Sequence, residues 1–413
     1  MNFPSNKRYL ALDLGTTTLA GRLSDPVGET LAEVQIANPQ RVLGADILSR
    51  LQQAFDGKGE DLQALLIEGL RDLIKQLLTK SDCEPSDIVA VVAAGNPGMS
   101  CLLRNLPVSS LLFPPHKPPY RELVSIPVDE IDLGLTAPLE IFPLVSGFVG
   151  GDLVACLLSA GAVLPGTLLV DVGTNAELAL WDGWHWWVTS AAAGPAFEGS
   201  NIGAGMILAA GAVSAVQLVD DRLQLAVAGG GQPRGLCGSG LAALVAAALR
   251  GGLIDVTGRI LCPEEVATNL SRYLVDQGGS WAICFHRSAA GELLLTQADV
   301  RNFQLAKGAV RAGVQVLIER GGFAAGDVPQ VLVTGALGTA LPVETLKRVA
   351  LLPEPMLDKT SFVTNGVLAG LQAYLTTADG QQRLTALMTM VQPFPLSGTP
   401  VFERRFLAAL EFI

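Results

Sequence analysis

Two short segments of this 413-residue chain share one acidic turn, in which an apolar run leads into Asp-x-Gly-Thr. The first is YLALDLGTTTLAG (Tyr9–Gly21), and the second is LLVDVGTNAELAL (Leu168–Leu180). Glycine lets the backbone of a turn approach a ligand closely, while threonine hydroxyls and backbone N–H groups supply hydrogen-bond donors. Such a turn can hold phosphate, although one copy alone more often marks an ordinary tight turn.

The two segments align at a constant offset that pairs Asp13 with Asp171 and Gly15 with Gly173. Each segment is typical of two β-strands joined by the acidic turn, so a β-hairpin is expected near the start of each half of the chain. A carboxylate alone repels phosphate, but two carboxylates suit a hydrated Mg²⁺ carried on the phosphates. The repeat therefore predicts two similar lobes whose hairpins clamp one nucleotide.

Two helices carry polar residues that such a ligand would meet. Asp152 lies near the start of an apolar helix, where a carboxylate usually only stabilises the helix dipole. An amphipathic helix is expected over residues 297–320, with Gln304, Lys307 and Arg311 on neighbouring turns of one face. These three side chains either reach a common ligand or form a solvated polar stripe, and the sequence leaves both readings open.

The last part of the chain contains a glycine turn and a helix of small residues. The run QVLVTGALGTAL indicates a strand that enters a turn at Gly335, Ala336, Leu337 and Gly338, and Asn365 stands at the head of the final small-residue helix. Chain length favours two substantial domains. The expected boundaries are residues 1–145 for the first lobe, 146–360 for the second, and 361–413 for a C-terminal helix and tail that return toward the first.

Composition limits the partners. The net charge is -11 and no run of Lys or Arg occurs, which argues against nucleic acid and against an anionic membrane surface. The start of the chain lacks a signal peptide, and the most apolar run is interrupted by Pro165-Gly166, so we expect a cytoplasmic protein without a membrane span. Six cysteines lie far apart and lack a CxxC pair, which predicts reduced thiols and no iron–sulfur cluster in this chain.

The order of these elements resembles the actin-like ATPase superfamily of sugar kinases, heat-shock chaperones and actin. That resemblance implies a two-lobed α/β fold of the duplicated ribonuclease H-like type, with ATP and Mg²⁺ in a cleft between the lobes. Asp13 and Asp171 would act on Mg²⁺ through water, and Asp152 would orient the attacking water. The implied nucleotide contacts are Gly15, Thr16, Thr17 and Thr18 in the first phosphate loop, Gly173, Thr174 and Asn175 in the second, Gly335, Ala336 and Gly338 in the adenosine loop, Gln304, Lys307 and Arg311 beside it, and Asn365.

Within that superfamily the chain is most similar to the ATPase portion of the reductive activators of corrinoid-dependent enzymes. The segments that carry this resemblance are NPQRVLGADILSRL, AAAGPAFEG, CGSG and QLAKGAVRAGVQVL, and it extends from about Tyr9 to the end. Members use ATP to help drive an electron onto an inactivated cobalt corrinoid. The implied partners are a corrinoid protein or its methyltransferase, and a homodimer is left open.

Two departures from the family pattern keep other functions open. Family members carry a ferredoxin domain before the ATPase portion, whereas this chain begins about where that portion begins, so a separate ferredoxin-type donor is expected. Ala336 and Leu337 stand where the family's adenosine turn has small, flexible residues, and added Cβ atoms hinder close approach of the backbone. The alternatives are a small-molecule kinase of the same fold and a non-catalytic binding module with a degenerate nucleotide cleft.

Overall fold

The computed structural model describes residues 7–289, 291–335, 337, 341–396 and 398–413. The chain divides into two compact units, each built from more than one segment. Unit 1 comprises Met1–Val163, Trp184–Val188 and Asn365–Pro393, and unit 2 comprises Leu164–Gly183, Thr189–Thr364 and Phe394–Ile413. Residues 146–163 thus group with unit 1, although the sequence placed them in the second lobe, because their helix packs against the helix that begins at Gly366.

Unit 1 is built on a six-stranded mixed sheet with the strand order β3-β2-β1-β4-β6-β5. The expected first hairpin is present, because β1 and β2 pair in antiparallel fashion, while β1 and β4 run parallel. The parallel pairing of β1 with β4 brings the carboxyl ends of both strands to one edge of the sheet. The strands are β1 (Arg8–Leu14), β2 (Thr18–Ser24), β3 (Thr30–Ala37), β4 (Ile88–Gly95), β5 (Val124–Ile126) and β6 (Leu139–Ile141).

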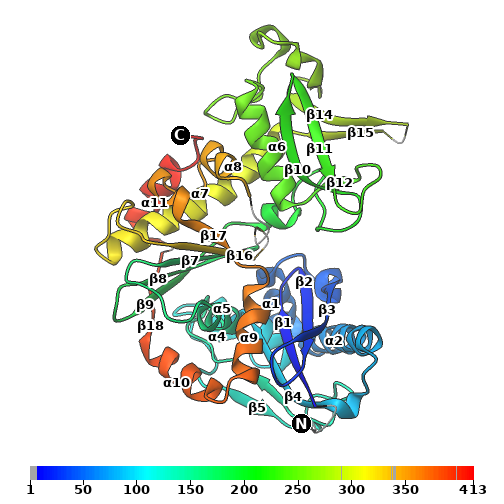
Figure 1. The fold of residues 1–413 in the computed structure, drawn as a ribbon, viewed down its shortest axis with the longest axis vertical. Helices are drawn as coiled ribbons and strands as arrows, with labels where there is room; N and C mark the ends of the chain where they lie inside the picture. Colours follow the sequence, from blue (N-terminus) through cyan, green and yellow to red (C-terminus); the bar gives the residue numbers. More distant parts are fainter. Residues whose placement is uncertain (1–6, 290, 336, 338–340, 397) are drawn as a thin grey trace. The chain divides into compact units, whose positions relative to one another are not determined.

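Helices cover this sheet (Figure 1). The long helix α2 (Gly59–Ser81) packs against β2 and β3, and its leucines at helical spacing are fully buried. Burying one leucine side chain contributes roughly 1.5–3 kcal/mol, so this stripe is what holds α2 on the sheet. The remaining helices of unit 1 are α1 (Ile47–Gln53), α3 (Pro97–Leu103), α4 (Ser109–Leu112), α5 (Gly151–Ala160), α9 (Gly366–Thr376) and α10 (Gly380–Met390).

A second six-stranded sheet has the order β17-β16-β7-β8-β9-β18 and contains the second expected hairpin, β7–β8. The central strand β7 is buried throughout and runs parallel to β16. In unit 2, α7 (Gln297–Arg320) packs against β8, and α11 (Pro400–Ala408) packs against α7. The strands are β7 (Leu168–Val172), β8 (Ala176–Trp181), β9 (Trp186–Ala191), β16 (Val331–Gly335), β17 (Thr360–Phe362) and β18 (Val391–Pro393).

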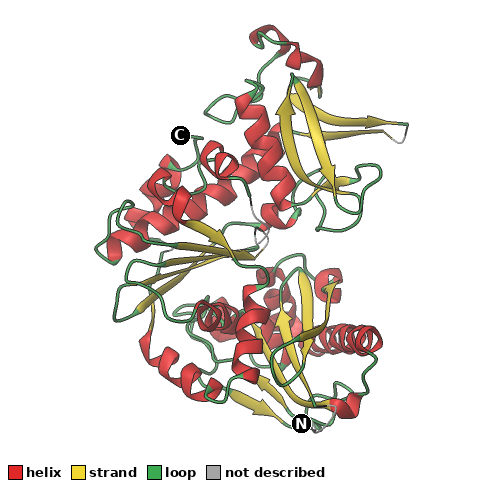
Figure 2. Ribbon diagram, viewed as in Figure 1, coloured by secondary structure: helices red, strands yellow, loops and turns green. Residues whose placement is uncertain are grey.

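Unit 2 also contains two three-stranded sheets, of order β11-β10-β12 and β13-β14-β15. Helix α6 (Gly238–Arg250) lies along β10 and contacts α8 (Val343–Arg348), as Figure 2 shows in red and yellow. Their strands are β10 (Ala212–Val219), β11 (Arg222–Val227), β12 (Gly235–Leu236), β13 (Leu274–Asp276), β14 (Trp281–Ser288) and β15 (Gly291–Leu295).

Short helical turns complete the described chain. They are 3₁₀ turns at Pro39–Val42, Pro85–Asp87, Pro195–Glu198, Pro263–Glu265, Asn269–Tyr273 and Glu354–Lys359, and a π-helical segment at Ala54–Lys58. Among the residues that the structure describes, no helix combines the length and apolar character needed to cross a membrane.

Candidate functional site

The first hairpin turns tightly at Gly15. A Cβ atom on this residue would lie only 2.4 Å from the carbonyl oxygen of Thr18, the first residue of β2, so the turn has no room for a side chain. Asp13 precedes the turn on β1, where it pairs with Ala94 of the parallel strand β4. The predicted phosphate loop therefore lies at the carboxyl edge of the unit 1 sheet.

Two asparagines hold this turn, and neither was among the predicted site residues. The amide nitrogen Nδ2 of Asn38 donates to the carbonyl of Gly15 at 2.9 Å, and the backbone N–H of Asn38 donates to the carbonyl of Thr17 at 2.9 Å. Asn96 Nδ2 donates to the Thr16 hydroxyl at 3.0 Å. Asn38 is fully buried, so its bonds form away from competing water. It belongs to the NPQ stretch that the sequence singled out, where its role was not recognised.

Asp152 lies in the first turn of α5, close to the same edge of the unit 1 sheet. A Cβ atom on Gly150, the residue before α5, would lie 2.3 Å from the carbonyl of Gly95, which places the start of α5 directly against the end of β4. Burial raises the pKa of the Asp152 carboxyl to about 6, although hydrogen bonds from backbone N–H groups, including that of Leu153, oppose the shift. A carboxyl with this pKa can exchange a proton near neutral pH.

In unit 2, the second hairpin lies beside Gly335, the residue that ends β16. Asp171 is buried on β7 and pairs with Thr334 of β16, and the N–H of Gly173 donates to the Asn175 carbonyl at 2.8 Å. Gly335 has a φ of +79°, and a Cβ atom there would lie 2.4 Å from Asp171 Oδ1. The structure thus brings the second predicted phosphate turn and the start of the predicted adenosine turn together. The predicted contacts Ala336 and Gly338 lie outside the described residues.

A glutamate that the sequence reasoning did not assign contacts the second hairpin. The hydroxyl of Thr174 donates a short hydrogen bond to Glu198 Oε2. Glu198 ends the 3₁₀ turn Pro195–Glu198, which lies in the AAAGPAFEG stretch of the sequence. The sequence offered one signal, a single glutamate in the glycine-bordered stretch AAAGPAFEG. The sequence alone does not show that this glutamate contacts the second hairpin.

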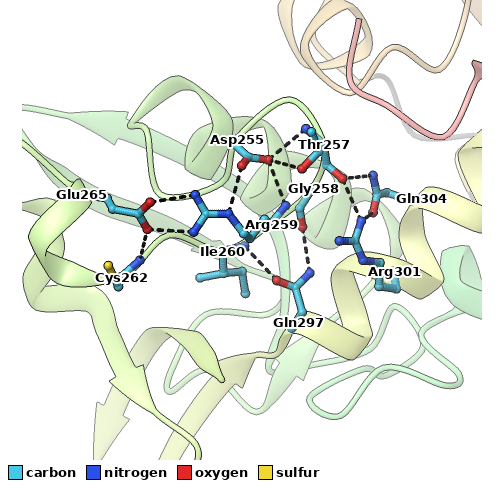
Figure 3. Close-up of polar contacts among 10 residues, drawn as sticks. All are labelled: Asp255, Thr257, Gly258, Arg259, Ile260, Cys262, Glu265, Gln297, Arg301 and Gln304. Atoms are coloured by element: carbon cyan, nitrogen blue, oxygen red, sulfur yellow. Dashed lines mark hydrogen bonds and ion pairs between the residues drawn. The ribbon is translucent and has the colours of Figure 1, made fainter. Parts of the chain in front are cut away.

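The polar side chains of α7 face the last residues of the chain in this structure. Gln304 Nε2 donates to the carbonyls of Thr257 and Leu410, at 2.9 and 2.8 Å. Figure 3 shows its contacts with Thr257 and with Arg301. Lys307 Nζ donates to the Glu411 carbonyl, and Arg311 Nη1 donates to the Ile413 carbonyl at 2.7 Å. The polar face is therefore not a solvated stripe, and an adenosine contact by these residues stays a prediction.

Lys307 is the most unusual of these side chains. It is completely buried, its ammonium lies 4.8 Å from the centre of the Phe412 ring, and burial, assisted by the neighbouring charge of Arg311, lowers its pKa to about 7. Asn365, also predicted to contact nucleotide, is the residue before α9 in unit 1, and its side-chain amide donates to Glu33 Oε1.

A groove with a volume of about 470 Å³ lies on unit 2 among β10, α6 and α8. Ala243 and Ala247 of α6 line it, together with Arg250 and Arg348. The volume falls in the range of small-molecule sites, and helix α8 is the first helix after the glycine turn at Gly335. In the part of the chain that the structure describes, no three His, Cys, Asp or Glu side chains are placed to bind a metal ion directly.

Comparisons with known proteins cover both units. Residues 9–162 match the RACo middle region, and residues 166–413 match the C-terminal domain of RACo, the ASKHA domain. The chain is 29% identical to the corrinoid activation enzyme RamQ of Eubacterium limosum, over 98% of this chain and 71% of that protein. It is 25% identical to the Co(II) methylated amine-specific corrinoid protein reductase of Methanosarcina barkeri, over 83% of this chain and 65% of that protein.

The fold agrees with these matches. A solved structure of a reductive activator for corrinoid, iron-sulfur protein has a TM-score of 0.91 to this chain at 27% identity, and it covers 99% of this chain and 67% of that one. The chain thus spans about two thirds of the length of these relatives. The actin-like ATPase fold predicted from the sequence is confirmed, and the chain belongs to the RACo family through its middle region and its ASKHA domain.

Proposed function

We propose that this chain binds and hydrolyses Mg-ATP and couples the nucleotide cycle to reactivation of a corrinoid protein. The observation that carries the first half is a pair of glycines, Gly15 and Gly335, neither of which has room for a Cβ atom. Gly15 follows Asp13 by two residues in the first hairpin, and Gly335 packs against the Asp171 carboxylate of the second. Backbone that close-packed can meet a phosphate or a ribose without side-chain interference.

The chemistry of the donor set fits hydrated Mg²⁺. Asp13 and Asp171 offer carboxylate oxygens, which a hard cation prefers, and the described residues include no cluster that would replace its water shell. Bound Mg²⁺ would neutralise charge on the transferred phosphoryl group. Thr16 and Thr17, held by Asn96 and Asn38, would present hydroxyl and backbone groups to phosphate oxygens.

Asp152 would orient the attacking water and accept its proton. A pKa of about 6 leaves the carboxyl ionised at neutral pH but close enough to the operating pH to exchange a proton. Asp13 lies at the carboxyl edge of the unit 1 sheet, a position at which ligands bind in α/β folds.

The client would be a corrinoid protein or its methyltransferase. Two relatives are named a corrinoid activation enzyme and a corrinoid protein reductase, which supports this class of client over the phosphorylation of a small molecule. One electron from a ferredoxin-type donor would convert Co(II) to Co(I), while ATP and water yield ADP and phosphate. Nucleotide would favour one client conformation only if the nucleotide-bound state binds that conformation better.

Two measurements test these proposals separately. Calorimetric titration of the chain with Mg-ATP should give saturable binding, and Asp13→Asn, which keeps the side-chain shape but removes the charge, should weaken it. An anaerobic absorbance assay should show Co(II) converted to Co(I) only when donor, ATP and this chain are all present. Absence of nucleotide binding refutes the first half, and cobalt reduction that is indifferent to the chain across several corrinoid proteins refutes the second.

A further inference from the structure

Arg50 of α1 is a fully buried arginine whose hydrogen-bond acceptors are all uncharged. Its Nε donates to the Gly44 carbonyl at 2.9 Å, and its Nη1 donates to Gln40 Oε1 at 3.3 Å and lies 3.7 Å from Met99 Sδ. Its Nη2 is buried and has no hydrogen-bond partner among the described residues. Unit 1 therefore encloses a guanidinium group that is only partly satisfied.

The Arg50 side chain keeps its positive charge at neutral pH. Burial lowers the pKa of the guanidinium to about 10, and the charge of Asp46 opposes this shift only in part. Such a group costs stability, because a buried charge loses its hydration and an unpartnered N–H group loses its hydrogen bond to water. Apolar side chains of similar volume often stabilise a core as well as buried ions do. Groups that break the rules of core packing occur mostly at functional sites, so the charge is better explained by what lies beside it.

Three contacts lead from this charge to the first hairpin. Arg50 Nη1 lies 3.7 Å from Met99 Sδ, that sulfur lies 3.9 Å from Asn38 Nδ2, and Asn38 Nδ2 donates to the Gly15 carbonyl at 2.9 Å. The guanidinium nitrogen therefore lies within roughly 11 Å of that carbonyl, close to the Debye length at 0.1 M salt. Close packing keeps the side chain there, because a Cβ atom on Gly44 would lie 2.9 Å from Arg50 Cγ.

The first hairpin is the place where a buried positive charge would act on a nucleotide. The turn is proposed to meet the phosphates of ATP, and Asp13 of β1 already brings a negative charge to it. Negative charges that gather where water is partly excluded repel each other strongly. A cation behind the turn offsets part of that repulsion, and salt screens a buried charge less than an exposed one. Arg50 is enclosed by protein, so it acts through its electric field and makes no contact with the ligand.

We propose that Arg50 is a positioning residue whose buried charge stabilises the phosphates of the nucleotide at the first hairpin. This inference rests on the proposed binding of Mg-ATP and adds a residue to that site.

The test measures nucleotide affinity by calorimetry, which does not require turnover. Arg50→Met keeps the length of the side chain and removes the charge. It should weaken binding of Mg-ATP about tenfold and of Mg-ADP about threefold, because Mg-ADP carries less negative charge. Arg50→Lys keeps the charge but cannot form the forked contacts, and it should bind Mg-ATP within about threefold of the parental chain. The matched control is Arg71→Met, which removes an exposed arginine of α2 and should leave both affinities unchanged.

A variant that keeps Arg50 makes the inference falsifiable if Arg50→Met fails to fold. Asp46→Asn removes the acid whose charge opposes that of Arg50, and asparagine caps a helix as well as aspartate does. It should tighten binding of Mg-ATP about twofold, whereas damage to the structure would weaken it.

The outcomes separate this inference from the function on which it rests. If the parental chain binds Mg-ATP, the role of the Arg50 charge is overturned by parental affinity in Arg50→Met, by equal weakening in the methionine and lysine variants, or by binding that does not tighten in Asp46→Asn. A parental chain that binds no nucleotide overturns the proposed function, and this inference with it.

Discussion

Replacing Lys307 by methionine should remove a pH dependence from the stability of the protein. The Lys307 side chain is fully buried on α7, and its pKa falls from the ordinary 10.5 to about 7, chiefly because burial disfavours its charged form. In the unfolded chain the same group keeps a proton up to a pH near 10. Between pH 7 and pH 9 the unfolded state therefore binds more protons than the native state, and stability rises with pH.

The size of the effect follows from the two pKa values. Integrating the difference in bound protons from pH 7 to pH 9 gives an increase of about 2 kcal/mol in the free energy of unfolding from this group alone. Methionine has a similar length and no titrating group, so Lys307→Met should lack this increase. Its absolute stability at one pH is less informative, because the variant also leaves the Glu411 carbonyl without its amine donor.

Urea unfolding followed by far-UV circular dichroism at pH 7, 8 and 9 measures this difference. Other groups that titrate in this range contribute equally to the free energy of unfolding of the parental chain and of Lys307→Met. The variant Lys75→Met, at an exposed position of α2, controls for the loss of a lysine. Parallel pH profiles for the parental chain and Lys307→Met would refute the buried-lysine reasoning. The same variant separates the two readings of α7: a large loss of Mg-ATP affinity would support the adenosine contact, whereas unchanged affinity would support a role in holding residues 410–413.

Three further predictions concern the carboxyls proposed to be catalytic and the packing of unit 1. Asp13→Asn and Asp171→Asn should each lower ATP turnover at least about 100-fold through lost charge stabilisation, with little change in melting temperature, and turnover at the parental rate would contradict the metal assignment. The turnover number should rise with pH through about 6, as Asp152 loses its proton, and a profile that keeps this limb in Asp152→Asn would assign it to another group. Gly370→Ala should cost at least about 2 kcal/mol in urea unfolding, since its Cβ would lie 1.7 Å from the Ala155 carbonyl, whereas Gly326→Ala, with open space around it, should be neutral.

The hairpins were predictable from the sequence because their pattern is local. An alternating apolar run, an acidic turn with glycine and a second run specify strand, turn and strand without reference to the rest of the chain. The duplicated copy then identified the fold class, which β1–β2 and β7–β8 confirm. The same local reasoning found α7, expected over 297–320 and observed over Gln297–Arg320.

The partners of the polar side chains were not predictable, because they depend on contacts between distant segments. Gln304 meets Leu410, more than one hundred residues away, and Asn365 meets Glu33. Helical spacing correctly grouped Gln304, Lys307 and Arg311 on one face, but spacing does not say whether a ligand, water or the chain itself covers that face. The aromatic stretch DGWHWW, which follows β8, shows the same limit, because the sequence does not say which tryptophans are buried. Trp186 is buried, while Trp184 is 80% exposed.

Two of the motifs that carry the family resemblance hold the hairpin regions in place from within the unit. Asn38 of NPQ donates to the carbonyls of Gly15 and Thr17 in the first turn, and Gly238 of CGSG allows close packing against Phe197, the residue before Glu198. Catalysis of phosphoryl transfer depends on positioning and electrostatics, so a displacement of the turns is as harmful as the loss of a carboxylate. We therefore expect substitutions of the buried residues behind each turn to be tolerated as poorly as substitutions of the aspartates in the turn. A search for function that weighs only exposed polar residues would miss Asn38, which is fully buried and lies one hydrogen bond from the Gly15 carbonyl.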